Sequence, residues 1–218
     1  MKKYIAVAGN IGVGKSTLVG LLAGRLAMQP FYEPVTENPY LADFYQNMRG
    51  WSFQSQVFFL AHRLRIQQQL MRLPGSVIQD RSIYEDAEIF AQNLYLQGLM
   101  SERDYETYRT LYTTSAEFIP APDLVIYLRA SVPTLLQRIA LRNRDYEKTI
   151  SPEYLDRLNG LYENWIQNFI VCPVLTVPAD DLDYVHFPQH LNLIAQKVQE
   201  KLTGKDVVIF EPDEVARL

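Results

Sequence analysis

A glycine-rich segment near the start of the chain constrains the fold more than any other feature. It reads AGNIGVGKST over residues 8–17, follows the apolar run YIAVA and precedes the helical pattern STLVGLLAGRLA. Gly9, four intervening residues and then Gly14-Lys15-Ser16 satisfy the G-x-x-x-x-G-K-[ST] pattern of a phosphate-binding loop between a strand and a helix. The alternative is an ordinary glycine-rich turn, which the flanking strand and helix disfavour.

This loop predicts a nucleoside triphosphate as ligand. Backbone N–H groups and the helix N-terminus point at the anion, the lysine supplies a charge, and the serine hydroxyl is a candidate Mg²⁺ ligand. The residues expected to contact the triphosphate are Gly9, Asn10, Ile11, Gly12, Val13, Gly14, Lys15, Ser16 and Thr17.

Short apolar runs separated by longer helical patterns indicate the fold class. We expect strands at 4–8, 30–35, 76–80, 123–128 and 173–177. Their continuous apolar character is typical of parallel strands covered by helices on both faces. We therefore predict a single α/β domain over residues 1–218, a P-loop NTPase-like three-layer fold with a five-stranded parallel sheet. The tail at 204–218 is a candidate for a short extra strand followed by a frayed end, which the sequence does not decide.

Composition excludes several classes of function. The net charge is −4 and no block of Lys and Arg occurs, which argues against a nucleic acid polymer as partner. No segment reaches the ~20 apolar residues that a membrane span needs. A lone cysteine, Cys172, and three scattered histidines predict neither a disulfide nor a zinc site, and they favour a cytoplasmic protein.

Acidic and basic side chains follow two of the predicted strands. Glu33 ends the second strand, and Asp80 and Arg81 end the third in QDRSIYED. Carboxyl ends of parallel strands meet at one edge of the sheet, so these groups are expected beside the phosphate loop. A carboxylate can accept a proton or hold Mg²⁺ there, and an arginine can neutralise the transferred phosphoryl group. The alternatives are a solvated strand-end carboxylate and a local ion pair that caps the next helix.

A helical segment after residue 51 has Gln56, Phe59 and Arg63 on one face. Asp86 and Phe90 have helical spacing after the third strand. An amide and a carboxylate can read the edge of a nucleobase, and an aromatic ring can stack on it. The alternative, which the sequence taken alone favours, puts both phenylalanines in the core and Gln56 and Arg63 on a solvated flank.

A third cluster is basic. Arg138 and Arg142 share a helix face, and Arg144 follows where that helix ends. Arginines on a closing segment can clamp the phosphates of the donor. The alternative is a solvated helix with scattered acidic partners.

Together these motifs resemble the deoxyribonucleoside kinase family over about residues 3–177. GNIGVGKST, EPVTENPY, WSFQSQ, DRSIYED and RNRDYEK stand in the family's order. The resemblance implies transfer of the ATP γ-phosphate to the 5′-hydroxyl of a deoxynucleoside, with Mg²⁺, in a homodimer. A deoxynucleoside triphosphate that occupies both subsites is a further candidate ligand, as a feedback inhibitor.

The family's roles can be carried over residue by residue. The resemblance implies that Glu33 meets the 5′-hydroxyl and that Tyr45 and Glu147 hold the 3′-hydroxyl. It assigns reading of the base edge to Gln56, Arg63 and Asp86, and stacking on the base to Phe90. Arg81 corresponds to the arginine of the transition state, and Ser16 and Asp80 to the Mg²⁺ ligands. The lid lies at about 142–150, and the arginines that match the family's lid arginines and bind ATP are Arg138, Arg142 and Arg144. Either Glu33 or Asp80 is the proton acceptor.

Two details of the family resemblance concern flexibility and the donor base. The lid reads Arg-Asn-Arg where Arg-Gly-Arg is commoner, which predicts a less flexible hinge at Asn143. PADDLDY at 178–184 is the expected counterpart of the loop against adenine.

The Asp-Arg-Ser form is similar to that of bacterial deoxyadenosine/deoxycytidine kinases. A deoxyguanosine-preferring kinase and a nucleoside monophosphate kinase are the alternatives. A carboxylate at Glu33 disfavours the monophosphate kinase, and a GTP switch is disfavoured because its Asp-x-x-Gly and Asn-Lys-x-Asp motifs do not occur.

Overall fold

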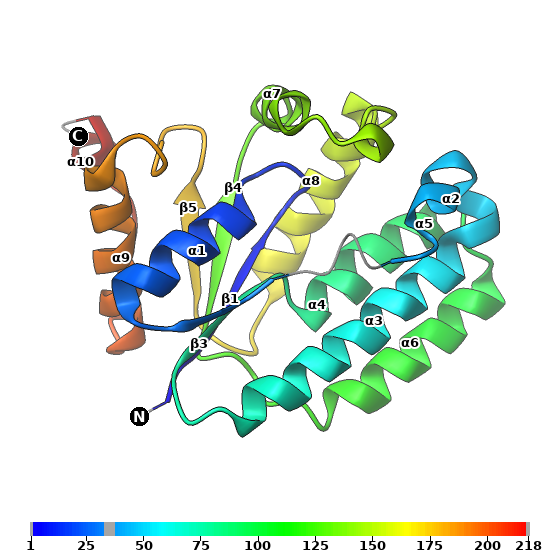
Figure 1. Cartoon of the computed structure of the whole chain (residues 1–218), viewed down its shortest axis with the longest axis horizontal. Coiled ribbons are helices and arrows are strands. Elements are labelled where there is room, and N and C mark those ends of the chain that lie inside the picture. Colours follow the sequence, from blue (N-terminus) through cyan, green and yellow to red (C-terminus); the bar gives the residue numbers. More distant parts are fainter. Residues whose placement is uncertain (1, 33–37, 217–218) are drawn as a thin grey trace.

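The structure is a computed structural model, which describes residues 2–32 and 38–216. Its centre is a parallel sheet with the strand order β2-β3-β1-β4-β5 (Figure 1). The strands within the described residues are β1 (Tyr4–Gly9), β2 (Gln29–Phe31), β3 (Val77–Asp80), β4 (Leu124–Arg129) and β5 (Val174–Pro178). The predicted sheet is confirmed. Its second strand is Gln29–Phe31, and residues 33–35 of the expected strand 30–35 lie outside the described residues.

The central strands are buried because helices cover both faces of the sheet. Every residue of β1 and β3 is buried, as the continuous apolar runs predicted. In the register, Val7 lies opposite Asp80 and Gly9 opposite Leu128. The carboxyl ends of β1, β3 and β4 therefore meet at one edge, where the phosphate loop begins.

On one face of the sheet α1 (Lys15–Leu26) packs against α9 (Pro188–Leu202). The chain then continues into a short helix, α10 (Pro212–Ala216), which lies beside α9 in Figure 1. The extra strand considered for the tail is wrong. Residues 205–211 form no strand, and an ion pair of 2.8 Å between Lys197 and Glu214 holds the tail as a helix on α9.

The remaining helices lie over the other face and along the carboxyl edge (Figure 1). They are α2 (Leu41–Gln46), α3 (Met48–Arg72), α4 (Ile83–Glu85), the π-helical turn η2 (Asp86–Ala91), α5 (Gln92–Leu96), α6 (Glu102–Ala116), α7 (Val132–Arg142), the 3₁₀ turn η3 (Asp145–Glu147) and α8 (Pro152–Asn168).

Side-chain caps define where three of these helices start. Asn47, Ser101 and Ser151 each accept a hydrogen bond from a backbone N–H in the first turn of α3, α6 and α8. Across the described residues, no helix combines the length and apolar character needed to cross a membrane.

Candidate active site

A cavity of about 880 Å³ lies at the carboxyl edge of the sheet. It extends from the phosphate loop to α3 and is bordered by α7, η3 and the segment after β5. The structure brings most of the predicted site residues to its wall: Ile11, Gly12, Gly14, Lys15, Ser16, Thr17, Tyr45, Gln56, Asp80, Arg81, Asp86, Phe90, Arg138, Arg142, Arg144 and Glu147. Gly9, Asn10, Val13 and Arg63 do not line it, and Glu33 falls outside the described residues.

The phosphate loop passes so close to β4 and α7 that two of its positions require glycine. A Cβ on Gly9, whose φ is +142°, would lie 2.7 Å from the Leu128 carbonyl oxygen. A Cβ on Gly12, whose φ is +83°, would lie 2.6 Å from Ile139 Cγ1. Lys15 Nζ donates to the carbonyl oxygens of Gly9 at 2.8 Å and Asn10 at 3.0 Å, so the ammonium group lies over the loop.

Asn10 supports the loop from behind instead of facing the cavity. Its amide nitrogen donates to the Leu155 carbonyl at 2.9 Å and to Asn159 Oδ1 at 2.8 Å, both on α8. Its amide oxygen accepts from the Ile11 N–H at 2.7 Å. The asparagine side chain thus fixes the loop to α8, a role that the motif alone does not indicate.

Asp80 and Ser16 lie on the cavity wall beside this loop. Ser16 Oγ donates to Asp80 Oδ2, and the aspartate is almost fully buried. Among the described residues, Asp80 Oδ1 has no hydrogen-bond partner. A buried carboxylate oxygen and a hydroxyl oxygen at the wall of the cavity are a donor set that suits Mg²⁺.

Arg81 has an unusual backbone conformation. Its φ is +65°, which is rare for a large side chain and points to a functional constraint. Its N–H donates to the Val7 carbonyl at 2.9 Å, and Arg63 Nη1 donates to its carbonyl at 3.3 Å. Its guanidinium lies 4.4 Å from the centre of the Phe90 ring. The backbone contacts hold the strained turn that directs this arginine into the cavity.

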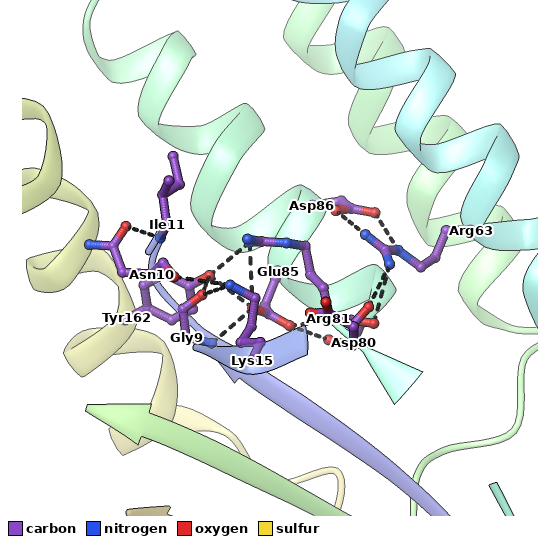
Figure 2. A network of polar contacts seen from close by, with 11 residues as sticks. Gly9, Asn10, Ile11, Lys15, Arg63, Asp80, Arg81, Glu85, Asp86 and Tyr162 are labelled. Carbon is purple, nitrogen blue, oxygen red and sulfur yellow. Dashed lines mark hydrogen bonds and ion pairs between the residues drawn. The ribbon is translucent and has the colours of Figure 1, made fainter. Parts of the chain in front are cut away.

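The far end of the cavity has a buried ion pair behind it. Arg63 Nε and Nη2 donate to the two carboxylate oxygens of Asp86 at 3.0 and 3.1 Å (Figure 2). Arg63 is 2% exposed and Gln56 is 4% exposed, so a solvated flank is wrong for both. The reason is that η2 and α6 cover this side of α3. Phe59 and Phe90 are half-buried and line the cavity.

The three arginines near the lid have different surroundings. Arg142 binds Glu147 through Nε at 3.0 Å and Nη2 at 2.7 Å, and Arg144 Nη1 lies 3.5 Å from the same carboxylate. Arg138 instead donates to the carbonyl oxygens of Val13 at 2.8 Å and Ala179 at 2.7 Å. A solvated helix with scattered acidic partners therefore does not describe Arg138, which connects the phosphate loop to the end of β5.

Asn143 ends α7 in the left-handed conformation, with φ +50° and ψ +45°. Asparagine is one of the few residues other than glycine that adopts this conformation readily. The departure from Arg-Gly-Arg therefore preserves the backbone turn at the start of the lid.

Glu85 and Tyr162 belong to the site but are not predicted from the sequence, and Tyr184 is expected there only as part of the segment at 178–184. Glu85 and Tyr162 are fully buried beside the phosphate loop and bind each other at 2.8 Å. Burial raises the pKa of the Glu85 carboxyl, and the Arg81 charge opposes that shift. Tyr184, in the segment expected to face adenine, places its hydroxyl 3.3 Å from the Gly14 carbonyl, and burial raises its pKa to about 12. The spacing Ser82-x-x-Glu85 signals a helix start, whereas nothing in the sequence marks Tyr162.

A parallel sheet with a phosphate loop after its first strand, an acid at the end of β3 and an arginine beside it defines a P-loop NTPase-like phosphotransferase. A family model described as deoxynucleoside kinase matches residues 5–203. The chain belongs to the deoxynucleoside kinase family, whose members are ATP-dependent phosphotransferases.

Three relatives illustrate the similarity. A deoxyadenosine/deoxycytidine kinase of Bacillus subtilis is 40% identical over 89% of this chain and 90% of its own length. A deoxyguanosine kinase of the same organism is 36% identical over 90% of this chain and 96% of its own length. A structure of the deoxyadenosine kinase of M. mycoides with dCMP and a flexible dCDP superposes with a TM-score of 0.81 at 34% identity. It covers 90% of this chain and 99% of the other. The same enzyme is known with dATP and with dCTP bound.

Proposed function

We propose that this deoxynucleoside kinase transfers the γ-phosphate of ATP to the 5′-hydroxyl of deoxyadenosine and deoxycytidine. The observation that carries the proposal is that one cavity joins the phosphate loop to Gln56 and Asp86. The first end suits a triphosphate, and the second offers an amide and a carboxylate, both buried, to the edge of a base.

The preference for these bases follows from hydrogen-bonding chemistry. Adenine and cytosine both carry an exocyclic amine next to a ring-nitrogen acceptor, so the Gln56 amide can bind either one. Arg63 holds the Asp86 carboxylate in place, which lets it accept from the amine. Guanine presents a carbonyl where the amine would be, and that oxygen would face a carboxylate. The names and ligands of the B. subtilis and M. mycoides relatives support this choice. The deoxyguanosine kinase among the relatives makes deoxyguanosine the second candidate.

Phosphoryl transfer assigns a role to each group at the other end. Lys15 and the N–H groups of the loop bind the β- and γ-phosphates, and Ser16 and Asp80 would hold Mg²⁺, which neutralises phosphate charge. Arg81 stabilises the charge on the transferred group. Glu33 orients the 5′-hydroxyl, and either Glu33 or Asp80 accepts its proton. The 5′-oxygen attacks the γ-phosphorus, and ADP leaves.

The lid residues complete the binding site in this proposal. Tyr45 and Glu147 lie on the cavity wall and bind the 3′-hydroxyl. Arg142 and Arg144, which both pair with Glu147, supply positive charge to the donor phosphates. The main role of Arg138 is to hold the loop through the Val13 carbonyl. The segment Asp180–His186 contributes side chains to the cavity wall and borders the adenine of ATP.

The functional unit is proposed to be a cytoplasmic homodimer. A groove of about 330 Å³ lies between η2 and α8. Its lining is mixed, with the apolar side chains of Trp165, Phe169 and Ile170 beside the polar side chains of Glu88, Asn164 and Asn168. Ile170 is 94% exposed in the single chain. An apolar residue that a partner subunit covers in a dimer would be exposed in this way. The cavity that accommodates a nucleoside and a triphosphate can also accept a deoxynucleoside triphosphate that spans both subsites, as a feedback inhibitor.

A substrate panel with a matched variant tests the function. The four deoxynucleosides are assayed with ATP and Mg²⁺, and deoxyadenosine and deoxycytidine should give the highest kcat/KM. Fastest phosphorylation of deoxyguanosine would refute the base assignment. Glu33→Gln should lower kcat strongly while ATP binding is retained, and Glu37→Gln, four residues later in the same motif, is the control. Normal turnover of Glu33→Gln would remove Glu33 from the mechanism.

A further inference from the structure

Glu85 is a buried carboxyl group for which the proposed mechanism has no role. It is 0% exposed and lies one turn after Arg81, at the end of α4. A buried carboxyl group is costly unless its oxygens are hydrogen-bonded, so its partners show what it does for the fold. Each of its two oxygens has a distinct set of partners.

The first oxygen has an ordinary structural partner. Glu85 Oε2 accepts from the Ser82 N–H at 2.8 Å and lies 3.3 Å from the Ser82 hydroxyl. This is the reciprocal half of a capping box that starts α4. A capping role accounts for one oxygen only.

The second oxygen reaches the phosphate loop and the arginine. Glu85 Oε1 accepts from the Gly9 N–H at 3.2 Å and lies 3.6 Å from Arg81 Nη1. Figure 2 shows this oxygen between the loop, Arg81 and Tyr162. Glu85 thus contacts both the first residue of the phosphate loop and the arginine that acts on the transferred phosphate.

Tyr162 completes the link from the other side. Its hydroxyl lies 2.8 Å from Glu85 Oε1 and 2.8 Å from the Gly9 carbonyl, and it accepts from Arg81 Nη1 at 2.9 Å. Its single hydrogen can be donated to either oxygen, so the tyrosine, the glutamate and Gly9 form one closed network around the Arg81 guanidinium. The Tyr162 ring is itself fixed by packing on Tyr127, at 5.7 Å between ring centres.

We propose that Glu85 and Tyr162 are positioning residues for phosphoryl transfer, which hold the Arg81 guanidinium in a fixed place relative to the phosphate loop. Arg81 already has a strained backbone, and its side chain is long, so its head group needs such contacts to stay in register with a phosphate bound by the loop. The donor phosphates and the arginine then reach the transition state as one prearranged unit. This inference rests on the proposed role of Arg81.

The test uses Glu85→Gln and Tyr162→Phe in the full-length enzyme. Gln keeps the shape and can still accept from the Ser82 N–H, but its amide turns donors toward the Gly9 N–H and Arg81. Phe keeps the ring packing and the capping box and loses only the hydroxyl. We expect kcat to fall by about 10²-fold in each, as small misplacements of catalytic groups do. KM for the deoxynucleoside and the affinity for ATP should stay within about threefold, because neither residue is assigned to substrate.

Glu163→Gln is the matched control. Glu163 also binds a tyrosine and an arginine, with Tyr127 Oη and Arg129 Nε each at 3.0 Å, but it is 37% exposed and lies away from the cavity. Its kcat should stay within twofold of the wild type. The double variant of Glu85 and Tyr162 should be little slower than either single variant, since both disturb one network.

The outcomes separate this inference from the proposed function. A wild-type enzyme that phosphorylates deoxynucleosides, with Tyr162→Phe within twofold of its kcat, overturns the inference alone. A wild type that is inactive on all deoxynucleosides overturns the function. If Glu85→Gln does not fold, Tyr162→Phe decides the matter, because it leaves the cap of α4 intact. A loss seen only in KM, with kcat retained, would likewise refute a positioning role.

Discussion

Replacing Arg63 by methionine removes the cation behind the base-binding end of the cavity. Methionine retains much of the apolar stem but none of the donors. The variant loses the two bonds to Asp86, at 3.0 and 3.1 Å, and the bonds from Nη1 to the carbonyl oxygens of Asp80 and Arg81, at 3.1 and 3.3 Å. The Asp86 carboxylate, 3% exposed, then remains buried without the guanidinium.

The size of the effect follows from burial. Each charge-assisted hydrogen bond contributes about 1.5–3 kcal/mol, and breaking a buried pair by removing one partner costs about 3–5 kcal/mol. We therefore expect the free energy of unfolding to fall by about 3–5 kcal/mol. At about 2–4 °C per kcal/mol for a chain of this size, the melting temperature should fall by roughly 10 °C. Activity should fall as well, since Asp86 and the Arg81 backbone lose their support.

The assay is urea unfolding at one fixed protein concentration, followed by tryptophan fluorescence. Arg129→Met is the control, because Arg129 pairs with Glu163 at 3.0 Å but is 63% exposed. That exposed pair should contribute at most about 1 kcal/mol. A double variant, Arg63→Met with Asp86→Leu, should recover part of the lost stability because neither charge of this buried pair remains. A loss below 1 kcal/mol for Arg63→Met would refute the reasoning that this pair is buried and tightly coupled.

Three further predictions concern the loop, the lid and pH. In Gly14→Ala, the new Cβ would lie 2.5 Å from Tyr184 Oη, and the backbone φ of +103° is unfavourable for alanine, so the affinity for ATP should fall. Adding Tyr184→Phe removes the clash but not the backbone strain, so it should restore the affinity only in part. Full recovery would show that the positive φ costs nothing. Asn143→Gly should leave the melting temperature nearly unchanged, whereas Asn143→Ala should cost about 1 kcal/mol because of the left-handed backbone; equal stability would contradict this. Burial raises the pKa of Glu85 above its usual 4.5, so folding favours the protonated carboxyl group. The protonated group therefore stabilises the fold below pH 4.5, and this stabilisation is lost as the pH rises through the raised pKa. Wild type should therefore lose free energy of unfolding relative to Glu85→Gln between pH 4.5 and 8, and the opposite slope would be inconsistent with a raised pKa.

The sequence predicted the scaffold because its signals are local. Apolar strands, the glycine spacing of the phosphate loop and the acid and arginine after the third strand each depend on a few consecutive residues. The topology of a parallel sheet places the carboxyl ends of its strands at one edge. The contact between Ser16 and Asp80 could therefore be predicted. The bounds of the second strand, Gln29–Phe31 in the structure, are harder to predict because propensity weakly defines where a short edge strand starts and stops.

Burial of polar groups was decided by tertiary structure. Gln56 and Arg63 have a polar helical pattern that suggests a solvated flank, and only the packing of η2 and α6 over α3 turns them inward. Arg138 resembles its neighbours on α7, but its partners are carbonyl oxygens about 125 and 41 residues away in sequence. The link between Glu85, Tyr162 and Gly9 joins three segments in the same way. Residue types and local spacing determine which polar groups are available. The hydrogen-bond partners of a buried polar group depend instead on which distant segments the fold brings within 3 Å, because no water is present there to act as a partner.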